Sequence, residues 1–175
     1  MSEGSKTPLM VIFCEPNNAT DNRVLDLLFN NAIQVAETGA EICWFRESKP
    51  LVIPKWNQKP KPHHLRRILL YYGNDNVDQL LIEFGQHKLY SLSPNLASVI
   101  VELHNKTLAR DSCGALMAFG RNMGFWIKSK CQEDLSTLPV IFTMRNNPSH
   151  MMIASLYTDQ IFEIDKDGNL VNLLS

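Results

Sequence analysis

The amino-terminal third of the chain alternates between apolar runs and a helical pattern. Residues 9–14 form an uninterrupted apolar run, which indicates a strand buried on both faces. From Asp21 to residue 36, apolar side chains recur every three or four positions, which predicts a helix, and Gly39 suits its C-terminal cap. Residues 42–45 predict a second strand. Such a parallel crossover would place the polar turn 15–20 at the carboxyl end of the first strand.

The rest of the chain continues the alternation. Residues 47–61, rich in Pro and Lys, predict a long loop over the carboxyl edge of the sheet. The later expectations are helices at 63–72, 94–109 and in part of 125–138, strands at 79–84, 114–119 and 140–144, loops at 85–95 and 120–124, and a turn at 165–169. We therefore expect one α/β domain over 1–175 with a flexible tail at 1–7. Its flavodoxin-like, doubly wound sheet would have about five parallel strands and helices on both faces.

Composition narrows the classes of partner and location. An apolar fraction of 45% and a charged fraction of 20% are those of an ordinary globular protein. The formal net charge is −1, so we expect no nucleic-acid partner. No apolar run approaches the roughly 18 residues of a membrane span, and no signal peptide is evident, so we expect no membrane partner and a cytoplasmic location. The four cysteines form no C-x-x-C pair, which favours small buried thiols.

Three predicted loops would meet at the carboxyl ends of the strands: 15–20, 85–93 and 120–124. The first suits a phosphate, because helix-start amides point outward there and the side chains of Thr20 and Asn22 add donors. Thr20 or Asp21 could equally be an ordinary N-cap. Tyr90 could stack on a planar ligand or only pack, and Gly120 could allow close approach of such a ligand or only form a turn.

The sequence contains no recognisable catalytic or metal-binding constellation. The five histidines lack metal-ligand spacing, and neither a G-x-G-x-x-G motif nor a Walker loop is present, so we expect no metal site. Residues 165–169 favour a β-turn over a calcium loop. An enzyme built on this chain would therefore need a bound cofactor for its chemistry.

The ordered series of loops resembles the flavodoxin-like NAD(P)H-dependent FMN reductase family. That family's first loop reads G-S-x-R-x-x-S-x-N-x-x-L, and here Thr20 stands at the second serine while Asn22 and Leu25 match. Residues 90–93 followed by 96–103 resemble the family's P-E-Y-N-x-S loop and L-K-N-A-I-D-x-L helix. Residues 114–124 resemble its fourth strand and third flavin loop, and 162–170 resemble its F-D-x-D-G-x-L close.

The resemblance implies an FMN-binding oxidoreductase that passes hydride from NAD(P)H through flavin to a small acceptor, as a homodimer or homotetramer. The flavin phosphate would bind near the first loop and the ring near the other two. The implied cofactor-binding residues are Asn17, Thr20, Asn22, Arg23, Tyr90, Ser91, Leu92, Ser93, Gly120, Arg121 and Asn122. The first loop departs from the family at the glycine, the serine and the arginine, and Glu15 adds a negative charge that Arg23 or Arg121 would have to offset.

Two alternatives to the flavin enzyme stay open. One is a flavodoxin-like domain that has lost the flavin and acts as a non-enzymatic binding or scaffold protein. The other is a protein that binds a different nucleotide or nucleoside in the same crevice. Glu15 and the missing glycine favour the scaffold protein, whereas Thr20, Asn22 and Tyr90 favour the flavin enzyme.

Overall fold

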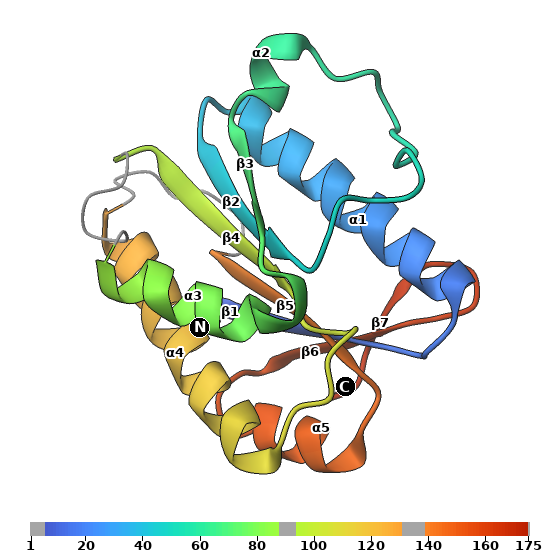
Figure 1. Ribbon diagram of the computed structural model, residues 1–175, viewed down its shortest axis with the longest axis vertical. Helices are drawn as coiled ribbons and strands as arrows, with labels where there is room; N and C mark the ends of the chain where they lie inside the picture. Colours follow the sequence, from blue (N-terminus) through green and yellow to red (C-terminus); the bar gives the residue numbers. More distant parts are fainter. Residues whose placement is uncertain (1–5, 88–93, 131–138, 175) are drawn as a thin grey trace, which may run out of the picture.

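A mostly parallel sheet forms the centre of the computed structural model, which describes residues 6–87, 94–130 and 139–174 (Figure 1). In these residues the sheet has seven strands, in the order β3-β2-β4-β5-β1-β6-β7. Six strands are parallel, and β7 pairs antiparallel with β6. Their bounds are β1 Leu9–Cys14, β2 Glu41–Arg46, β3 Ile68–Tyr72, β4 Leu96–Glu102, β5 Val140–Arg145, β6 Gln160–Ile164 and β7 Leu170–Asn172.

Helices cover both faces of this sheet (Figure 1). Helix α1, Asn18–Glu37, packs on one face against a core that includes Ile12, Ile42 and Ile100. On the other face lie α3, Val77–His87, α4, Arg110–Lys130, and α5, Pro148–Ala154. The expected α/β class, doubly wound with helices on both faces, is thus confirmed, with seven strands in place of about five. Among the described residues, no helix is both long and apolar enough to cross a membrane.

The first crossover spans an unusual distance in the sheet. Strand β1 lies between β5 and β6, so the chain passes over β5 and β4 before it forms β2. In the flavodoxin order, 2-1-3-4-5, the first strand lies between the second and the third. Three strand spacings correspond to about 14 Å. Helix α1, with 20 residues, is long enough to cross that distance obliquely and to cover the strands between.

The expected elements with the clearest patterns are confirmed. Strands β1, β2 and β5 coincide with the apolar runs predicted at 9–14, 42–45 and 140–144. Helix α1 covers the predicted helix and begins three residues earlier, at Asn18. Gly39 has a φ of +93°, a conformation that favours glycine, and it ends the turn after α1. The turn at 165–169 is also confirmed, because the Asp165 side chain accepts from the backbone N–H groups of Asp167 and Asn169.

Two predicted strands, 79–84 and 114–119, are wrong. Residues 79–84 lie inside α3, and 114–119 lie inside α4, which also includes the predicted loop 120–124. The physical reason is visible in their composition. The segment 114–119, Gly-Ala-Leu-Met-Ala-Phe, has no β-branched residue and is rich in strong helix formers. An apolar run of six residues cannot by its periodicity separate a strand from a buried helix segment.

Two predicted helices, 63–72 and 94–109, are also wrong. The first becomes the short helix α2, Pro62–Leu65, followed by strand β3. The second becomes β4, and all seven residues of β4 are buried. Val99, Ile100 and Val101 are consecutive β-branched residues, which pack well in a sheet covered on both faces. Apolar residues recur every three to four positions in this segment only because nearly every position of β4 is apolar.

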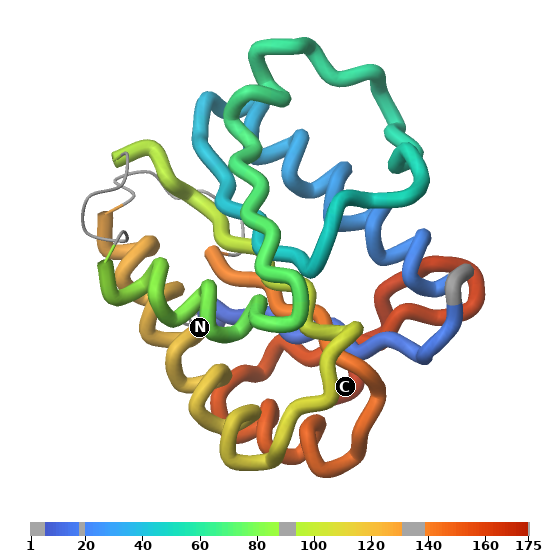
Figure 2. The backbone as a smooth tube through the Cα atoms, viewed as in Figure 1, coloured from blue at the N-terminus to red at the C-terminus, as the bar shows by residue number. Residues whose placement is uncertain are grey.

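The long loop after β2 does not lie over the carboxyl edge of the sheet as predicted. Residues 48–61, called the strap below, cross the outer side of α1 and lead to α2 (Figure 2). The backbone N–H of Lys55 donates to Asp26 Oδ1 at 2.7 Å, and Asn30 Nδ2 donates to the Lys55 carbonyl at 2.8 Å. The N–H of Asn57 donates to Asn30 Oδ1 at 2.9 Å. Polar side chains of α1 therefore hold the strap by its backbone.

Part of the predicted flexible tail 1–7 is tied to the fold. The N–H of Thr7 donates to Asp159 Oδ1 at 3.3 Å, and its carbonyl accepts from Gln160 Nε2. These contacts anchor the residues just before β1 to the start of β6. Residues 1–5 of the predicted tail lie outside the described residues.

Candidate functional site

Two crevices open where neighbouring strands send the chain to opposite faces of the sheet. After β1 and β2 the chain continues on the α1 face, whereas after β4 and β5 it continues to α4 and α5 on the other face. Because β5 lies beside β1 and β4 lies beside β2, the connections diverge at both junctions. Open α/β sheets bind ligands outside the carboxyl ends of strands at such switch points.

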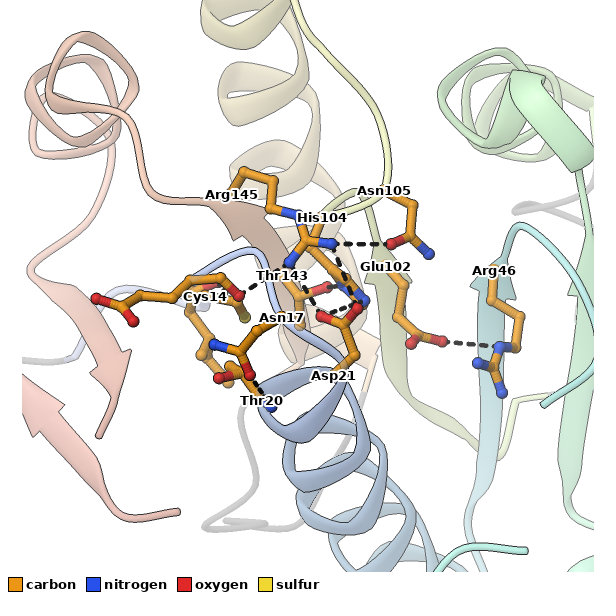
Figure 3. A network of polar contacts seen from close by, with 12 residues as sticks. Cys14, Asn17, Thr20, Asp21, Arg46, Glu102, His104, Asn105, Thr143 and Arg145 are labelled. Atoms are coloured by element: carbon orange, nitrogen blue, oxygen red, sulfur yellow. Dashed lines mark hydrogen bonds and ion pairs between the residues drawn. The ribbon is translucent and has the colours of Figure 1, made fainter. Parts of the chain in front are cut away.

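Arg145, the last residue of β5, ties together three segments at this edge (Figure 3). Its guanidinium donates to both carboxylate oxygens of Asp21, at 3.0 and 3.3 Å, in the first turn of α1. It also donates to the backbone carbonyl of Glu15 at 3.0 Å and to Asn105 Oδ1 at 3.3 Å. The loops after β1 and β4 are therefore connected through one side chain of β5.

His104 lies buried beneath this arginine. Its Nδ1 is 2.8 Å from Thr143 Oγ1, and its Nε2 is 3.9 Å from Asp21 Oδ1 (Figure 3). Burial lowers the pKa of His104 to about 4, and the nearby Asp21 carboxylate opposes that shift only in part. The imidazole is therefore neutral at neutral pH. A neutral, buried imidazole can accept or donate one hydrogen bond at each ring nitrogen without adding charge to the site.

Glu102, the last residue of β4, is a second buried titratable group. Its Oε2 accepts from Trp44 Nε1 at 2.8 Å and is 3.0 Å from Arg46 Nε. The Arg46 guanidinium lies 5.7 Å from the centre of the Trp44 ring, within cation–π range. Burial raises the pKa of Glu102, whereas Arg46 and the Trp44 hydrogen bond lower it. Strands β2 and β4 are thus joined by a polar contact at their carboxyl ends.

A cavity of about 310 Å³ lies between the loops that follow β4 and β5. We call it the amide pocket, because three asparagines line it with Lys106 and Arg145. Asn146 Nδ2 donates to Glu163 Oε1 at 2.6 Å, but its Oδ1 is buried without a hydrogen-bond partner among the described residues. The residues that line the amide pocket are Leu103, His104, Asn105, Lys106, Thr107, Leu108, Met144, Arg145, Asn146, Asn147 and His150. An unpaired buried acceptor is the mark of a position that water or a ligand fills.

A second cavity, of about 250 Å³, opens on the other side of the loop 103–109. We call it the acid pocket, because Glu47, Asp75 and Glu102 line it and Lys106 is the cation among its lining residues. Asn105, Lys106 and Thr107 line both pockets. Lys106 Nζ contacts Asp78 Oδ1 and donates to the Asp75 carbonyl at 3.2 Å. The two pockets are therefore adjacent and differ in charge.

The first-loop residues proposed from the sequence lie at the start of α1. Asn17 is the N-cap, and its side chain accepts from the Thr20 N–H at 2.7 Å. Thr20 is buried, whereas Asn22 and Arg23 are exposed. One of the amides expected to receive a phosphate is therefore occupied by a side chain of the same loop. Glu15 is exposed, and its backbone carbonyl, not its carboxylate, contacts Arg145.

Three other proposed flavin residues lie in a helix and do not form the predicted third loop. Gly120, Arg121 and Asn122 lie within α4; a Cβ on Gly120 would be 2.5 Å from Phe142 Cζ, so this glycine serves helix–sheet packing. Arg121 lies 5.6 Å from the Phe125 ring on the exposed side of α4. The residues proposed for the middle loop, Tyr90, Ser91, Leu92 and Ser93, lie outside the described residues.

The described residues do not fit a flavin in the family's manner. The third flavin loop is helical, the first turn of α1 includes the Asp21 carboxylate, and Arg145 is already engaged by that carboxylate. Within the described part of the chain, no group of three or more His, Cys, Asp or Glu side chains could hold a metal ion. No protein-family model and no curated protein matches this sequence.

Sequence reasoning missed the residues that form this site. The sequence predicts Asp21 only as a cap and His104 only as a histidine without metal-ligand spacing, and it predicts no site role for Asn105, Arg145 or Asn146. A signal for two of them was available, because Arg145 ends β5 and Asn146 follows it, and the apolar pattern predicted this strand correctly. For His104 and Asn105 the signal was hidden, because residues 94–109 were interpreted as a helix.

Proposed function

We propose that this protein binds a small nucleotide-class molecule across the amide and acid pockets. The observation that supports it best is the pair of adjacent pockets at the carboxyl edge, which share Asn105, Lys106 and Thr107. The acid pocket lies at the switch point between β2 and β4, which is the usual place for a ligand in an open α/β sheet. The loop 103–109 would contact the middle of the ligand.

The chemistry of the two pockets suits the two ends of a nucleotide. An anionic end would take a charge-assisted hydrogen bond from Lys106, which lines both pockets. Sugar hydroxyls or a base amino group would donate to Glu47 and Asp75 in the acid pocket. The competing interpretation is structural: Arg145 and Asp21 would merely connect three loops.

Isothermal titration of the purified chain with AMP, FMN, NADP⁺ and inorganic phosphate tests the proposal. We expect at least one nucleotide to bind more tightly than phosphate, because only a nucleotide reaches both pockets. Lys106→Gln should weaken this binding by roughly tenfold, through loss of a charge-assisted hydrogen bond. The melting temperature should change little, because partly exposed ion pairs contribute at most about 1 kcal/mol.

Lys166→Gln, in the exposed turn 165–169, is the matched control and should leave nucleotide binding unchanged. Absence of binding to every nucleotide at about 1 mM, a concentration that reveals weak sites, would contradict the proposal. Equal binding by the Lys106→Gln protein would place the ligand elsewhere on the molecule.

FMN-dependent reduction by NAD(P)H is the second candidate, and the sequence resemblance supports it. The described residues favour it less, because Gly120 to Asn122 belong to a helix. An absorbance spectrum of the purified protein, before and after addition of FMN, tests it directly. Flavin fluorescence that is quenched on binding, followed by bleaching with NADPH, would favour this enzyme. Binding of AMP without binding of FMN would contradict the flavin enzyme and support only the nucleotide-binding role.

A further inference from the structure

The strap, residues 48–61, exposes apolar side chains and contacts α1 through its backbone. The backbone at residues 55 and 57 is hydrogen-bonded to the side chains of Asp26 and Asn30 in α1, whereas the large apolar side chains of the strap are exposed. Leu51 and Ile53 are 102% and 79% exposed, and Trp56 is 44% exposed. Several large exposed apolar side chains within one short loop, called the apolar tip below, mark an interaction surface, unlike isolated ones.

The strap is also strongly basic. It contains four lysines and no acidic residue, although the whole chain has a net charge of −1. Lys49, Lys55, Lys59 and Lys61 are all exposed, and none forms an ion pair with any residue that the structure describes. The apolar tip is therefore surrounded by unpaired positive charge, and the rest of the molecule is net acidic.

The strap keeps its shape because both its composition and its contacts limit its freedom. Pro50, Pro54 and Pro60 restrict the backbone within it, and Pro62 begins α2 directly after it. The three hydrogen bonds to α1 fix residues 55–57. Ordering entropy is therefore already lost in the free protein, so a partner would not have to order this loop.

We infer that the strap docks this protein onto the surface of an anionic lipid bilayer. Leu51, Ile53 and Trp56 would enter the interfacial region, where apolar and indole side chains are stabilised. The surrounding lysines would remain at the level of the headgroups and contact anionic lipids. Charge complementarity favours this occupant, because a negative surface attracts the basic strap and repels the acidic remainder of the chain. Docking of this kind buries a loop and inserts no helix.

A protein partner fits the strap less well than a bilayer. Leu51 is as exposed as in an extended chain, and no strap residue lines the amide pocket or the acid pocket. A protein would need a complementary groove for this tip, whereas a bilayer interface requires no matching shape. The inference does not depend on the proposed nucleotide site.

Co-sedimentation of the full chain with lipid vesicles tests the inference. We expect binding to phosphatidylcholine vesicles that contain about 30% phosphatidylserine, little binding to pure phosphatidylcholine, and release at high salt. Trp56 emission should shift to the blue on binding, and Trp56→Phe should remove that shift. The triple change Lys49→Gln, Lys55→Gln and Lys59→Gln should weaken binding by roughly 100-fold.

Ile53→Asp should weaken vesicle binding at least tenfold, because a carboxylate at the tip opposes both insertion and the negative surface. The matched control is Leu156→Asp, at a position 74% exposed just after α5, which should bind like the unchanged protein. Absence of binding to anionic vesicles at low salt would overturn the inference and leave the strap to a protein partner. Binding that survives Ile53→Asp and the triple lysine change would also overturn it.

Discussion

His104 is the residue whose protonation most directly affects the stability of the carboxyl edge. Its pKa is about 4 in the folded protein and 6.5 without the fold. Between these values only the unfolded chain takes up the proton, so stability falls as the pH decreases from 6.5 and levels off below 4. We expect this residue to lower the free energy of unfolding by about 2 kcal/mol between pH 7 and pH 5, measured by urea denaturation.

His104→Gln should remove that part of the pH dependence, because glutamine does not titrate. His87→Gln, at the exposed end of α3, is the matched control and should leave the pH profile unchanged. A His104→Gln protein whose stability falls as steeply between pH 7 and pH 5 as the unchanged chain would show that His104 is not the titrating group.

Glu102 gives a second prediction at the residue scale. Glu102→Ala would leave the Trp44 N–H and the Arg46 guanidinium without their buried partner, at a cost of about 3 kcal/mol in unfolding free energy. Glu102→Gln keeps an acceptor for Trp44 and loses only the charge, so we expect a cost of about 1 kcal/mol. Denaturant midpoints measure both. Equal losses for the two variants would contradict a role for the Trp44 hydrogen bond.

Residues of the candidate site could be predicted from the sequence only where their strand was recognised. Arg145 follows a correctly predicted strand, so its position at the carboxyl edge was accessible. His104 follows a strand that was interpreted as a helix, and its burial against Thr143 depends on a contact across 39 residues. Side-chain partners so far apart in the chain leave no local pattern.

Helix α4 allows a matched test of glycine packing at the scale of one element. A Cβ on Gly120 would lie 2.5 Å from Cζ of Phe142, which is fully buried, whereas a Cβ on Gly114 would lie 3.9 Å from its nearest neighbours, Ile153 and Tyr157. Gly120→Ala should therefore destabilise the protein by about 2 kcal/mol through overpacking. Gly114→Ala should stabilise it by about 0.5–1 kcal/mol, because alanine favours the helix.

Thermal denaturation followed by circular dichroism measures both glycine variants. Stabilisation by Gly120→Ala would show that α4 can move away from β5 at little cost. Destabilisation by Gly114→Ala would show that the space beside Gly114 is smaller than the structure indicates.

At the scale of elements, composition separated helix from strand better than spacing did. The wrong strand at 114–119 lacks β-branched residues, and the wrong helix at 94–109 contains Val99, Ile100 and Val101 in succession. The spacing of apolar residues gave the right answer for α1, where polar residues occupy the opposite face. A buried segment without polar positions has no periodicity to interpret.

The burial of three cysteines predicts how the whole molecule reacts with thiol reagents. Burial raises the pKa of Cys14 and of Cys43 to about 12 and also raises the pKa of Cys113, so the reactive thiolate is scarce. In a Cys131→Ser background, labelling by an aromatic disulfide reagent should proceed only as fast as the protein unfolds. Denaturant should make all three thiols react at once, and rapid labelling of the native protein would contradict the core assignment.

The order of the strands could not be predicted from the sequence. The alternation of elements predicted the α/β class, but it contains no information on which strand lies beside which. Strand β1 pairs with β5 and β6, and those pairings are made by side chains and backbone groups more than 100 residues apart. Only the folded sheet identifies β4 and β2 as the neighbours whose connections diverge.

The position of β1 has a consequence for how the chain is made. Leu9 pairs with Val140, so about 130 residues must be synthesised before β1 meets its first neighbour. At roughly 5–20 residues per second, a nascent chain would hold this apolar hexapeptide without a strand on either side for about ten seconds. We expect chaperones that recognise short extended apolar segments to bind β1 on the ribosome, and to release it when β5 emerges.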